Sequence, residues 1–145
     1  MLVTLRPGTG ADREWLAELR AEVLRADLER LGRYDPVRVR QRFRDAFRPE
    51  HTRVIVVDAA SRGSIAVRPE ADAQWIEHFY LAPALQGQGV GREVLTWVLA
   101  AADARPFRLN VLRGSQARRL YERHGFTVDS QDAVDVFMSR PGSAR

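Results

Sequence analysis

A glycine-rich loop at residues 86–92, Gln-Gly-Gln-Gly-Val-Gly-Arg, holds the residues whose types and spacing point most directly to chemistry. A β-like run precedes it, and an apolar helical pattern begins at Val90. Gly87, Gly89 and Gly91 let the backbone approach a ligand without a Cβ, and the N–H groups of the helix's first turn point at an anion with the helix dipole behind them. The loop therefore predicts a phosphate-binding site, with a pyrophosphate as the expected ligand.

The spacing within this loop excludes two common phosphate-binding fingerprints. A G-x-G-x-x-G pattern begun at Gly87 needs a third glycine where Arg92 stands, and a P-loop needs a lysine, which the chain lacks. The residues fit Q-x-x-G-x-G instead, with Gln86, Gly89 and Gly91 in the specified places. A tight turn with close helix packing also explains such glycines. A second pattern is therefore needed before the loop can be assigned to ligand binding.

The second pattern lies at residues 109–126. It reads as a strand, a short helix that carries Ala-x-x-Leu-Tyr and ends at Tyr121, and a closing Gly-Phe pair. Together and in this order, the two patterns resemble the coenzyme A loop and the following segment of the GNAT acetyltransferase superfamily. The chain departs from that superfamily at Gly114, because an asparagine is common there, and the polar contact of that asparagine is not expected here.

The resemblance implies an α/β fold: a mixed, mostly antiparallel sheet of about seven strands with four helices and splayed central strands. One N-acetyltransferase domain is expected over residues 1–145. The periodicity of the chain agrees with this architecture. It predicts a turn at 61–64, strands at 2–6, 53–58, 65–67, 74–81, 107–112, 126–128 and 134–138, and helices at 11–31, 36–47, 89–103 and 116–124.

Acetyl-CoA is the co-substrate that the resemblance implies. The pantetheine arm is expected to bond to the backbone of the strand before the loop, and the pyrophosphate to the N–H groups of the loop. The arginines at 92, 118 and 119 are candidates for the 3′-phosphate, although exposed arginines commonly meet only water. The expected cofactor-binding residues are Phe79, Leu81, Gln86, Gly87, Gln88, Gly89, Val90, Gly91 and Arg92.

Two residues are predicted to be catalytic. The resemblance assigns Tyr121 to protonation of the departing coenzyme sulfur, which suits a phenol; the alternative is an aromatic anchor between helix and sheet. Glu77 is the expected base for the amine, directly or through a water, because burial beside aromatic rings favours a raised carboxyl pKa. The alternative for Glu77 is an ion pair with an arginine. Strand alternation places Trp75, Glu77 and Phe79 on one face, so His78 on the other face ranks second.

The expected reaction is direct attack of a primary amine, on a small molecule or on a peptide or protein, on the thioester. Four aromatic residues are candidates for lining the amine pocket, although core packing explains them equally well: Trp15, Tyr34, Phe47 and Trp75. A non-catalytic acyl-CoA-binding module is the alternative from another class, and Gly114 favours it. A nucleic-acid-binding domain is a third reading, but the chain shows no recognition motif for it.

Composition narrows the chemistry further. The chain has no cysteine and no lysine, which excludes disulfides, thiolate zinc sites and Schiff-base catalysis. Its three scattered histidines have no metal-ligand spacing, so no metal is expected. The net charge of +4 is modest, and the arginine-rich stretch 38–48 has helical apolar spacing, so a solvated basic helix face is favoured over a nucleic-acid surface. No signal or membrane segment is evident, which predicts a cytoplasmic protein, and dimerisation is expected by analogy alone.

Overall fold

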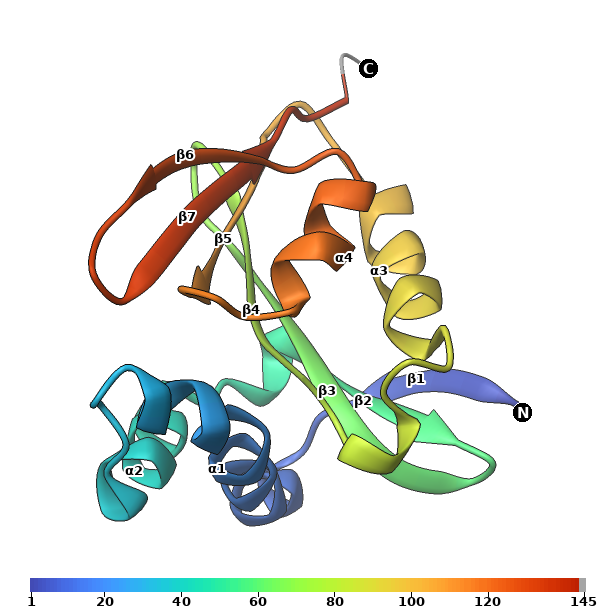
Figure 1. Cartoon of the computed structure of the whole chain (residues 1–145). Coiled ribbons are helices and arrows are strands. Elements are labelled where there is room, and N and C mark those ends of the chain that lie inside the picture. Colours follow the sequence, from blue (N-terminus) through green and yellow to red (C-terminus); the bar gives the residue numbers. More distant parts are fainter. Residues whose placement is uncertain (144–145) are drawn as a thin grey trace.

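The computed structural model describes residues 1–143, which form seven strands and four α-helices with three short 3-10 turns between them (Figure 1). The helices are α1 (Arg13–Arg30), α2 (Pro36–Ala46), α3 (Val90–Ala100) and α4 (Ala117–Arg123). The strands are β1 (Val3–Pro7), β2 (Thr52–Val57), β3 (Ala60–Pro69), β4 (Gln74–Leu81), β5 (Phe107–Leu112), β6 (Thr127–Gln131) and β7 (Asp135–Arg140).

All seven strands belong to one sheet in the order β1-β2-β3-β4-β5-β7-β6. Every neighbouring pair is antiparallel except β4 and β5, which run parallel. These two strands pair only at Gln74 with Phe107 and at Trp75 with Arg108. Beyond Trp75 the two central strands are no longer paired with each other, which confirms the predicted mixed sheet with splayed central strands.

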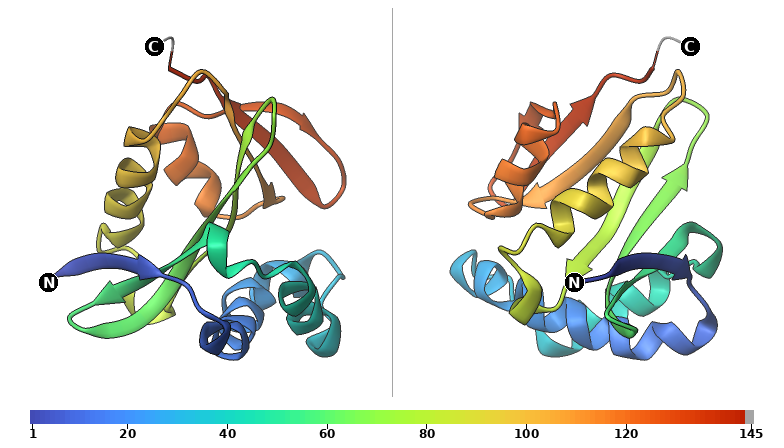
Figure 2. Two further views of the ribbon diagram at one scale, coloured as in Figure 1. Left: turned by 180° about the vertical axis from the view of Figure 1, so that it is seen from behind. Right: turned by 90° about the vertical axis from the view of Figure 1, so that its right-hand side faces the viewer.

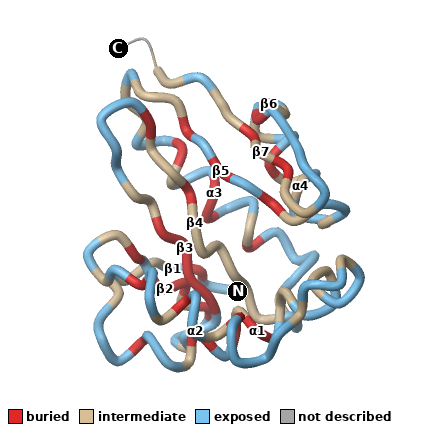
Figure 3. The backbone as a smooth tube through the Cα atoms, turned by 90° about the vertical axis from the view of Figure 1, so that its left-hand side faces the viewer, coloured by how far each residue is buried: buried red, intermediate tan, exposed pale blue. Residues whose placement is uncertain are grey.

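The helices cover the two faces of the sheet separately, as both views in Figure 2 show. α1 and α2 form a small core of their own that includes Leu16 and Phe43 and packs against Tyr80 of β4. α3 and α4 lie on the opposite face, where Leu95 and Tyr121 join the larger core with residues of the strands. Buried residues are frequent in β2, β3 and β5, whereas α2 and β6 are largely exposed (Figure 3). No helix within residues 1–143 combines the length and apolar character that crossing a membrane requires.

The turn between β2 and β3 differs from the predicted position. Asp58 and Ala59, at φ 49° and 68°, connect the strands directly, and residues 61–64 lie within β3. Two consecutive residues with positive φ form the tight turn whose twist suits a two-residue hairpin. Gly63, which suggested a turn, serves a close approach within the sheet instead, because a Cβ there would overlap the carbonyl oxygen of Tyr80.

β4 contains a bulge that changes which side chains share a face. Ser64 pairs with Tyr80 and Ala66 with Glu77, so one residue of β3 lies opposite two of β4. His78 adopts φ 47°, and its carbonyl oxygen accepts a hydrogen bond from the Ser64 hydroxyl at 2.8 Å. The expected strict alternation along this strand is therefore wrong. An extra residue shifts the register by one, and every later side chain then changes face.

After the bulge, side chains of β4 divide between the two layers of helices. His78 lies against Phe43 of α2, with ring centroids 5.0 Å apart, and therefore shares the α1–α2 face with Glu77. Phe79 and Leu81 pack instead on the larger core beneath α3 and α4. The predicted grouping of Glu77 with Phe79, and the separation of Glu77 from His78, are both corrected.

Candidate active site

The glycine loop begins where β4 ends and leads directly into α3. Gly89 precedes the first residue of α3 with φ 84°, and Gly87 has φ 76°. Both values lie in the left-handed region, where a side chain is strained, so glycine is required by the backbone itself. The Gln86 amide donates to the carbonyl oxygen of Leu81 at 3.1 Å and ties the exposed loop to the strand end. The first-turn N–H groups of α3 are thereby presented at the surface beside the splayed strands.

Gly91 has a different role from its two neighbours in the loop. A Cβ at this position would lie 3.4 Å from Leu120 and 3.8 Å from Phe79, so a small residue lets α3 approach α4 and β4. The three arginines predicted as candidates for the 3′-phosphate lie in α3 and α4. Arg118 is paired with Glu122 at 3.4 Å, whereas Arg92 and Arg119 make no ion pair within residues 1–143.

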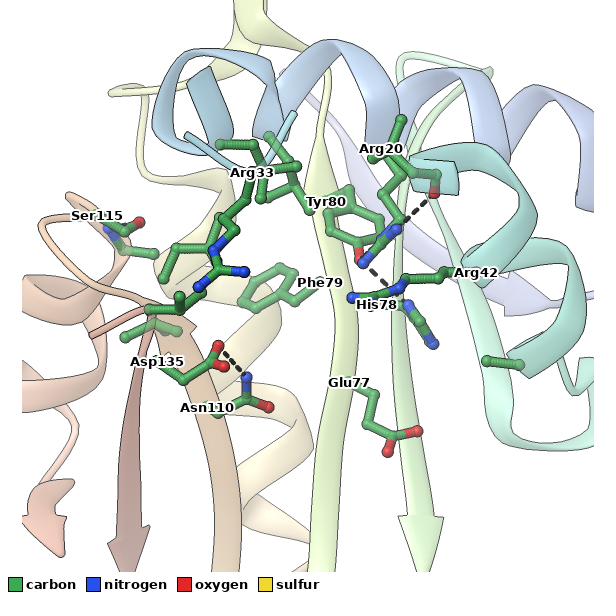
Figure 4. Close-up of a pocket in the computed structure, with 18 of the residues that line it drawn as sticks. Arg20, Arg33, Arg42, Glu77, His78, Phe79, Tyr80, Asn110, Ser115 and Asp135 are labelled. Carbon is green, nitrogen blue, oxygen red and sulfur yellow. Dashed lines mark hydrogen bonds between the residues drawn. The ribbon is translucent and has the colours of Figure 1, made fainter. Parts of the chain in front are cut away.

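A cavity of about 1200 Å³ occupies the space between the splayed strands and the α1–α2 layer (Figure 4). Its walls come from both of those helices and their connection, from β4 and β5, and from the connection between β6 and β7. None of residues 86–92 lines it. The loop and the cavity are thus two distinct parts of the surface that meet at β4.

Tyr121 reaches this cavity from the opposite layer. Its ring is buried, with Phe126 at 5.6 Å and Phe79 at 6.4 Å between ring centroids. Within residues 1–143 its hydroxyl makes no hydrogen bond, although the residue lines the cavity. Burial raises the pKa of Tyr121 well above its usual value, so the hydroxyl is protonated at neutral pH. The ring is an aromatic anchor, and the side chain also forms part of the cavity wall.

Glu77 lies on the cavity wall and is held by Arg68. One carboxylate oxygen, Oε1, accepts from Arg68 Nε at 3.0 Å and from Nη2 at 2.9 Å. The Glu77 side chain remains 30% exposed, so the pair is reached by solvent. The ion pair that the sequence left open as an alternative is present, and it positions a carboxylate at the cavity. Arg68 also lies over the ring of Trp75 at 5.8 Å and makes a further ion pair with Glu70.

A hydrogen-bonded chain of three residues, Arg20, Tyr80 and His78, lies beside Glu77. Arg20 Nε donates to the Tyr80 hydroxyl oxygen at 2.9 Å, and that hydroxyl lies 3.1 Å from His78 Nδ1. The direction of this second hydrogen bond depends on which ring nitrogen of His78 carries the proton. Burial lowers the pKa of His78 to about 4, with a further contribution from the charge of Arg20. His78 is therefore neutral near pH 7.

Sequence reasoning did not include Arg20 or Tyr80 in the site. Their contact spans sixty residues of chain, and it depends on the bulge that turns Tyr80 toward α1. No glycine or proline at position 78 marks that bulge in the sequence. Nothing in the local pattern signals these two residues.

Of the four aromatic residues expected at the acceptor pocket, only Tyr34 lines the cavity. Trp15 donates its indole N–H to Asp12 at 2.8 Å, and Phe47 is buried in the small α1–α2 core. Trp75 lies beside Arg68 on the sheet, away from the lining. The prediction is corrected at these three positions, where a hydrogen bond to Asp12, the small helical core and the contact with Arg68 account for the rings.

Gly114 stands at the position where the superfamily commonly has an asparagine. Arg30 of α1 contacts the chain at this turn. The φ of Gly114 is 81°, and the guanidinium of Arg30 lies 2.8 Å from the place a Cβ would occupy. Arg30 Nη2 donates to the carbonyl oxygen of Arg113 at 2.6 Å and so holds this turn against α1. Ser115 Oγ accepts from the N–H of Ala117 at 3.2 Å, and α4 begins at Ala117, one residue later than predicted. An arginine from a distant helix thus makes the polar contact at this turn.

Comparison with known proteins gives a consistent result. A family model described as the acetyltransferase (GNAT) domain matches residues 49–128. The solved structure of PaiA N-acetyltransferase from Thermoplasma acidophilum in complex with coenzyme A is 19% identical, with a TM-score of 0.76 over 97% of this chain and 99% of that one. The ribosomal-protein-S18-alanine N-acetyltransferase of Escherichia coli is 15% identical (TM-score 0.73; 99% and 96% covered). The structure of YjaB from Escherichia coli is 20% identical, with a TM-score of 0.73 over 99% of this chain and 100% of that one. No curated protein sequence matches the chain significantly.

Proposed function

The chain belongs to the GNAT family of acetyltransferases, acyltransferases that use acetyl-CoA, and from this premise we propose that it transfers the acetyl group to a primary amine by direct attack of the amine on the thioester. The acceptor is a small molecule or the amino group of a peptide or protein. No group of three or more His, Asp or Glu side chains within residues 1–143 could hold a metal ion, and the proposal uses none.

One observation carries this proposal: a protonated tyrosine and a carboxylate line the same cavity at the gap where β4 leaves β5, next to a helix that follows two left-handed glycines. The gap starts after Trp75, and Tyr121 and Glu77 both line the cavity there. Gly87 and Gly89 leave the start of α3 open to an anion. These features fit a long cofactor with a pyrophosphate at one end and a reactive thioester at the other.

The cofactor-binding residues follow from this fit. The backbone N–H groups of residues 87–92 would hold the pyrophosphate at the start of α3, and the backbone of Phe79 and Leu81 would bond the pantetheine arm as an added strand. Gln86 would keep the loop in place through its bond to Leu81. Arg92 and Arg119 are the candidates for the 3′-phosphate because neither makes an ion pair within residues 1–143.

When bound, acetyl-CoA supplies an acetyl thioester with a thiol as leaving group. Tyr121 holds a proton on its hydroxyl oxygen and gives it to the sulfur as the amine attacks. Burial raises the pKa of Tyr121, so the hydroxyl carries its proton before the reaction begins. The surrounding rings of Phe79 and Phe126 fix the orientation of the phenol and exclude water from it.

The base that takes the proton of the amine is proposed to be Glu77, directly or through one water. Arg68 occupies Oε1, and Oε2 accepts no hydrogen bond within residues 1–143. His78 lies on the same face and is the second candidate, but a pKa of about 4 makes it a weak base at neutral pH. The position of its Nδ1 opposite the Tyr80 hydroxyl supports a positioning role instead.

Thermal unfolding with and without acetyl-CoA tests the proposal first, with NADH, ATP and a DNA oligonucleotide as control ligands. At a hundred times its dissociation constant a ligand adds about 2.7 kcal/mol, a shift of roughly 5 °C for a chain of this size. Of these ligands, we expect only acetyl-CoA to raise the unfolding temperature. In a separate assay, we expect an acceptor amine to cause thiol release from acetyl-CoA. A shift without thiol release from any amine would favour a non-catalytic acyl-CoA-binding module, and no shift would contradict both functions.

A further inference from the structure

The cavity wall carries more positive than negative charge. Six arginines and four carboxylates line it: Arg20, Arg33, Arg38, Arg42, Arg48 and Arg68, against Asp35, Glu77, Asp132 and Asp135. A wall of this kind attracts anions and repels polyamines. Which of these charges are available to a ligand depends on their existing partners.

The four carboxylates all have partners within the fold. Asp35 accepts from two N–H groups at the start of α2, and Glu77 is paired with Arg68. Asp132 Oδ1 accepts from the N–H groups of Val134 and Asp135, and Asp135 Oδ1 accepts from the Asn110 amide at 3.0 Å. Because each carboxylate already accepts hydrogen bonds within the fold, it neutralises a neighbouring guanidinium less effectively.

The arginines divide into two groups. Arg20, Arg48 and Arg68 donate to Tyr80, to backbone carbonyls of residues 45 and 47, and to Glu77 respectively. The other three, Arg33, Arg38 and Arg42, make no side-chain hydrogen bond and no ion pair within residues 1–143. Arg33 helps to lower the pKa of Asp132, which is set mainly by the backbone N–H groups of Asp135 and Val134, but it makes no ion pair with that carboxylate.

Two of these three guanidinium groups point into the same space. In Figure 4 Arg33 extends from the connection between α1 and α2 and Arg42 from α2, and both are directed toward β4 near His78 and Phe79. Arg38 lies one turn before Arg42 on α2 and also lines the cavity. The glycine loop is not part of this wall, so these arginines are separate from the proposed pyrophosphate site.

We propose that the acceptor amine carries a second, anionic group, a carboxylate or a phosphate, which Arg33 and Arg42 bind while the amine faces Glu77. This inference rests on the proposed acetyltransferase function and names the substrate class of the same site. Guanidinium groups form forked, charge-assisted hydrogen bonds to carboxylate and phosphate oxygens, and two of them, one from the α1–α2 connection and one from α2, would fix the position of such a group.

The test compares acceptors in matched pairs, by thiol release from acetyl-CoA. Leucine is compared with leucinamide and O-phosphoethanolamine with ethanolamine, and spermidine serves as a polycation. We expect kcat/KM to favour the anionic member of at least one pair by about tenfold or more, as expected for a charge-assisted bond. The pair that shows this preference identifies the anion as carboxylate or phosphate.

Variants then locate the effect. Arg33→Gln and Arg42→Gln should each raise KM for the anionic acceptor by about tenfold and leave KM for its neutral partner nearly unchanged. Arg13→Gln, at the far end of α1 and outside the cavity lining, is the matched control and should change neither. Binding of acetyl-CoA should be the same in all four proteins.

Two results would overturn the inference and leave the acetyltransferase function intact: equal use of the neutral, cationic and anionic acceptors by the unmodified protein, or an equal loss for both members of a pair in the variants. The acceptor series needs no variant, so it decides the question even if a substitution prevents folding. Failure of acetyl-CoA to bind would instead overturn the proposed function, and this inference with it.

Discussion

The loop at residues 86–92 and the arginine-lined cavity both adjoin β4, but they present different kinds of groups to a ligand. The loop presents backbone N–H groups at the start of α3, arranged by glycines at φ 76° and 84°. The cavity presents side chains from three helices, from four strands and from the connections between these elements. A site built from backbone depends on a short local segment, whereas a site built from side chains depends on contacts across the whole chain.

The two regions are therefore expected to respond differently to substitution. Changes in the loop should affect cofactor binding, whatever the acceptor. Changes in the cavity should affect the acceptor and leave the cofactor nearly untouched. Tyr121 lies between the regions and should affect the chemical step alone.

The largest effect is expected for Tyr121→Phe, which removes the proton donor and keeps the buried ring. We expect kcat to fall by about a hundredfold, the lower range for loss of a general acid. Acetyl-CoA binding, measured by calorimetry, should change little, because the phenyl ring still packs on Phe79 and Phe126. An unchanged kcat would reduce Tyr121 to an aromatic anchor.

Glu77→Gln should lower kcat/KM by about thirtyfold at neutral pH, because solvent replaces part of the function of a lost base. The rate should also lose the acidic limb of its pH profile, since no carboxylate remains to be protonated. The measurement is kcat/KM against pH for both proteins. If the variant keeps the acidic limb of the unmodified protein, Glu77 is not the base.

His78→Gln tests whether His78, the second candidate for the base, contributes to the stability of the fold. The pKa of His78 in the fold, about 4, lies below its unfolded value of 6.5, so the unfolded chain binds the proton more readily. Stability from this residue is present above pH 6.5 and is lost as the pH falls toward 4, by about 2 to 3 kcal/mol. Glu77 opposes this shift and Arg20 adds to it.

We expect the free energy of unfolding of His78→Gln to depend less on pH between 6.5 and 4 than that of the unmodified protein. Denaturant unfolding at several pH values measures this difference. A glutamine can still form a hydrogen bond with Tyr80 but does not titrate. The comparison therefore isolates the effect of protonating His78. Parallel curves for the two proteins would contradict the burial argument.

The smallest effect is expected for Gly89→Ala, where a methyl group meets only Arg92 Nη2, at 4.0 Å, but the backbone is strained. A left-handed residue other than glycine costs about 1 kcal/mol or more, so the dissociation constant of acetyl-CoA should rise by about fivefold or more. Gly32→Ala is the matched substitution on the cavity side, with φ 69° and nothing within 4 Å. It should lower stability similarly and leave the acetyl-CoA constant unchanged; equal weakening in both would contradict the separation of the regions.

Most elements of the fold follow from local patterns. The helix at 36–46 begins where Asp35 and Pro36 predict it, and Asp35 accepts from two N–H groups of its first turn. Six of the seven strands lie close to their predicted bounds, but β3 is much longer, because the turn before it lies at Asp58 and Ala59. Nothing in the local residue types distinguishes a glycine that turns the chain from one that permits close approach within a sheet, as at Gly63.

The sequence by itself determined the family, the glycine loop before α3, and the places of Glu77 on a strand and Tyr121 on a short helix. These depend on motifs and periods within short segments, where neighbouring residues and backbone geometry decide the outcome. Tertiary structure alone decided the bulge at His78, the packing of Arg30 on Gly114, and the convergence of Arg33 and Arg42 beside β4. Each of these joins segments far apart in the chain, and their positions depend on packing between layers that no local pattern records.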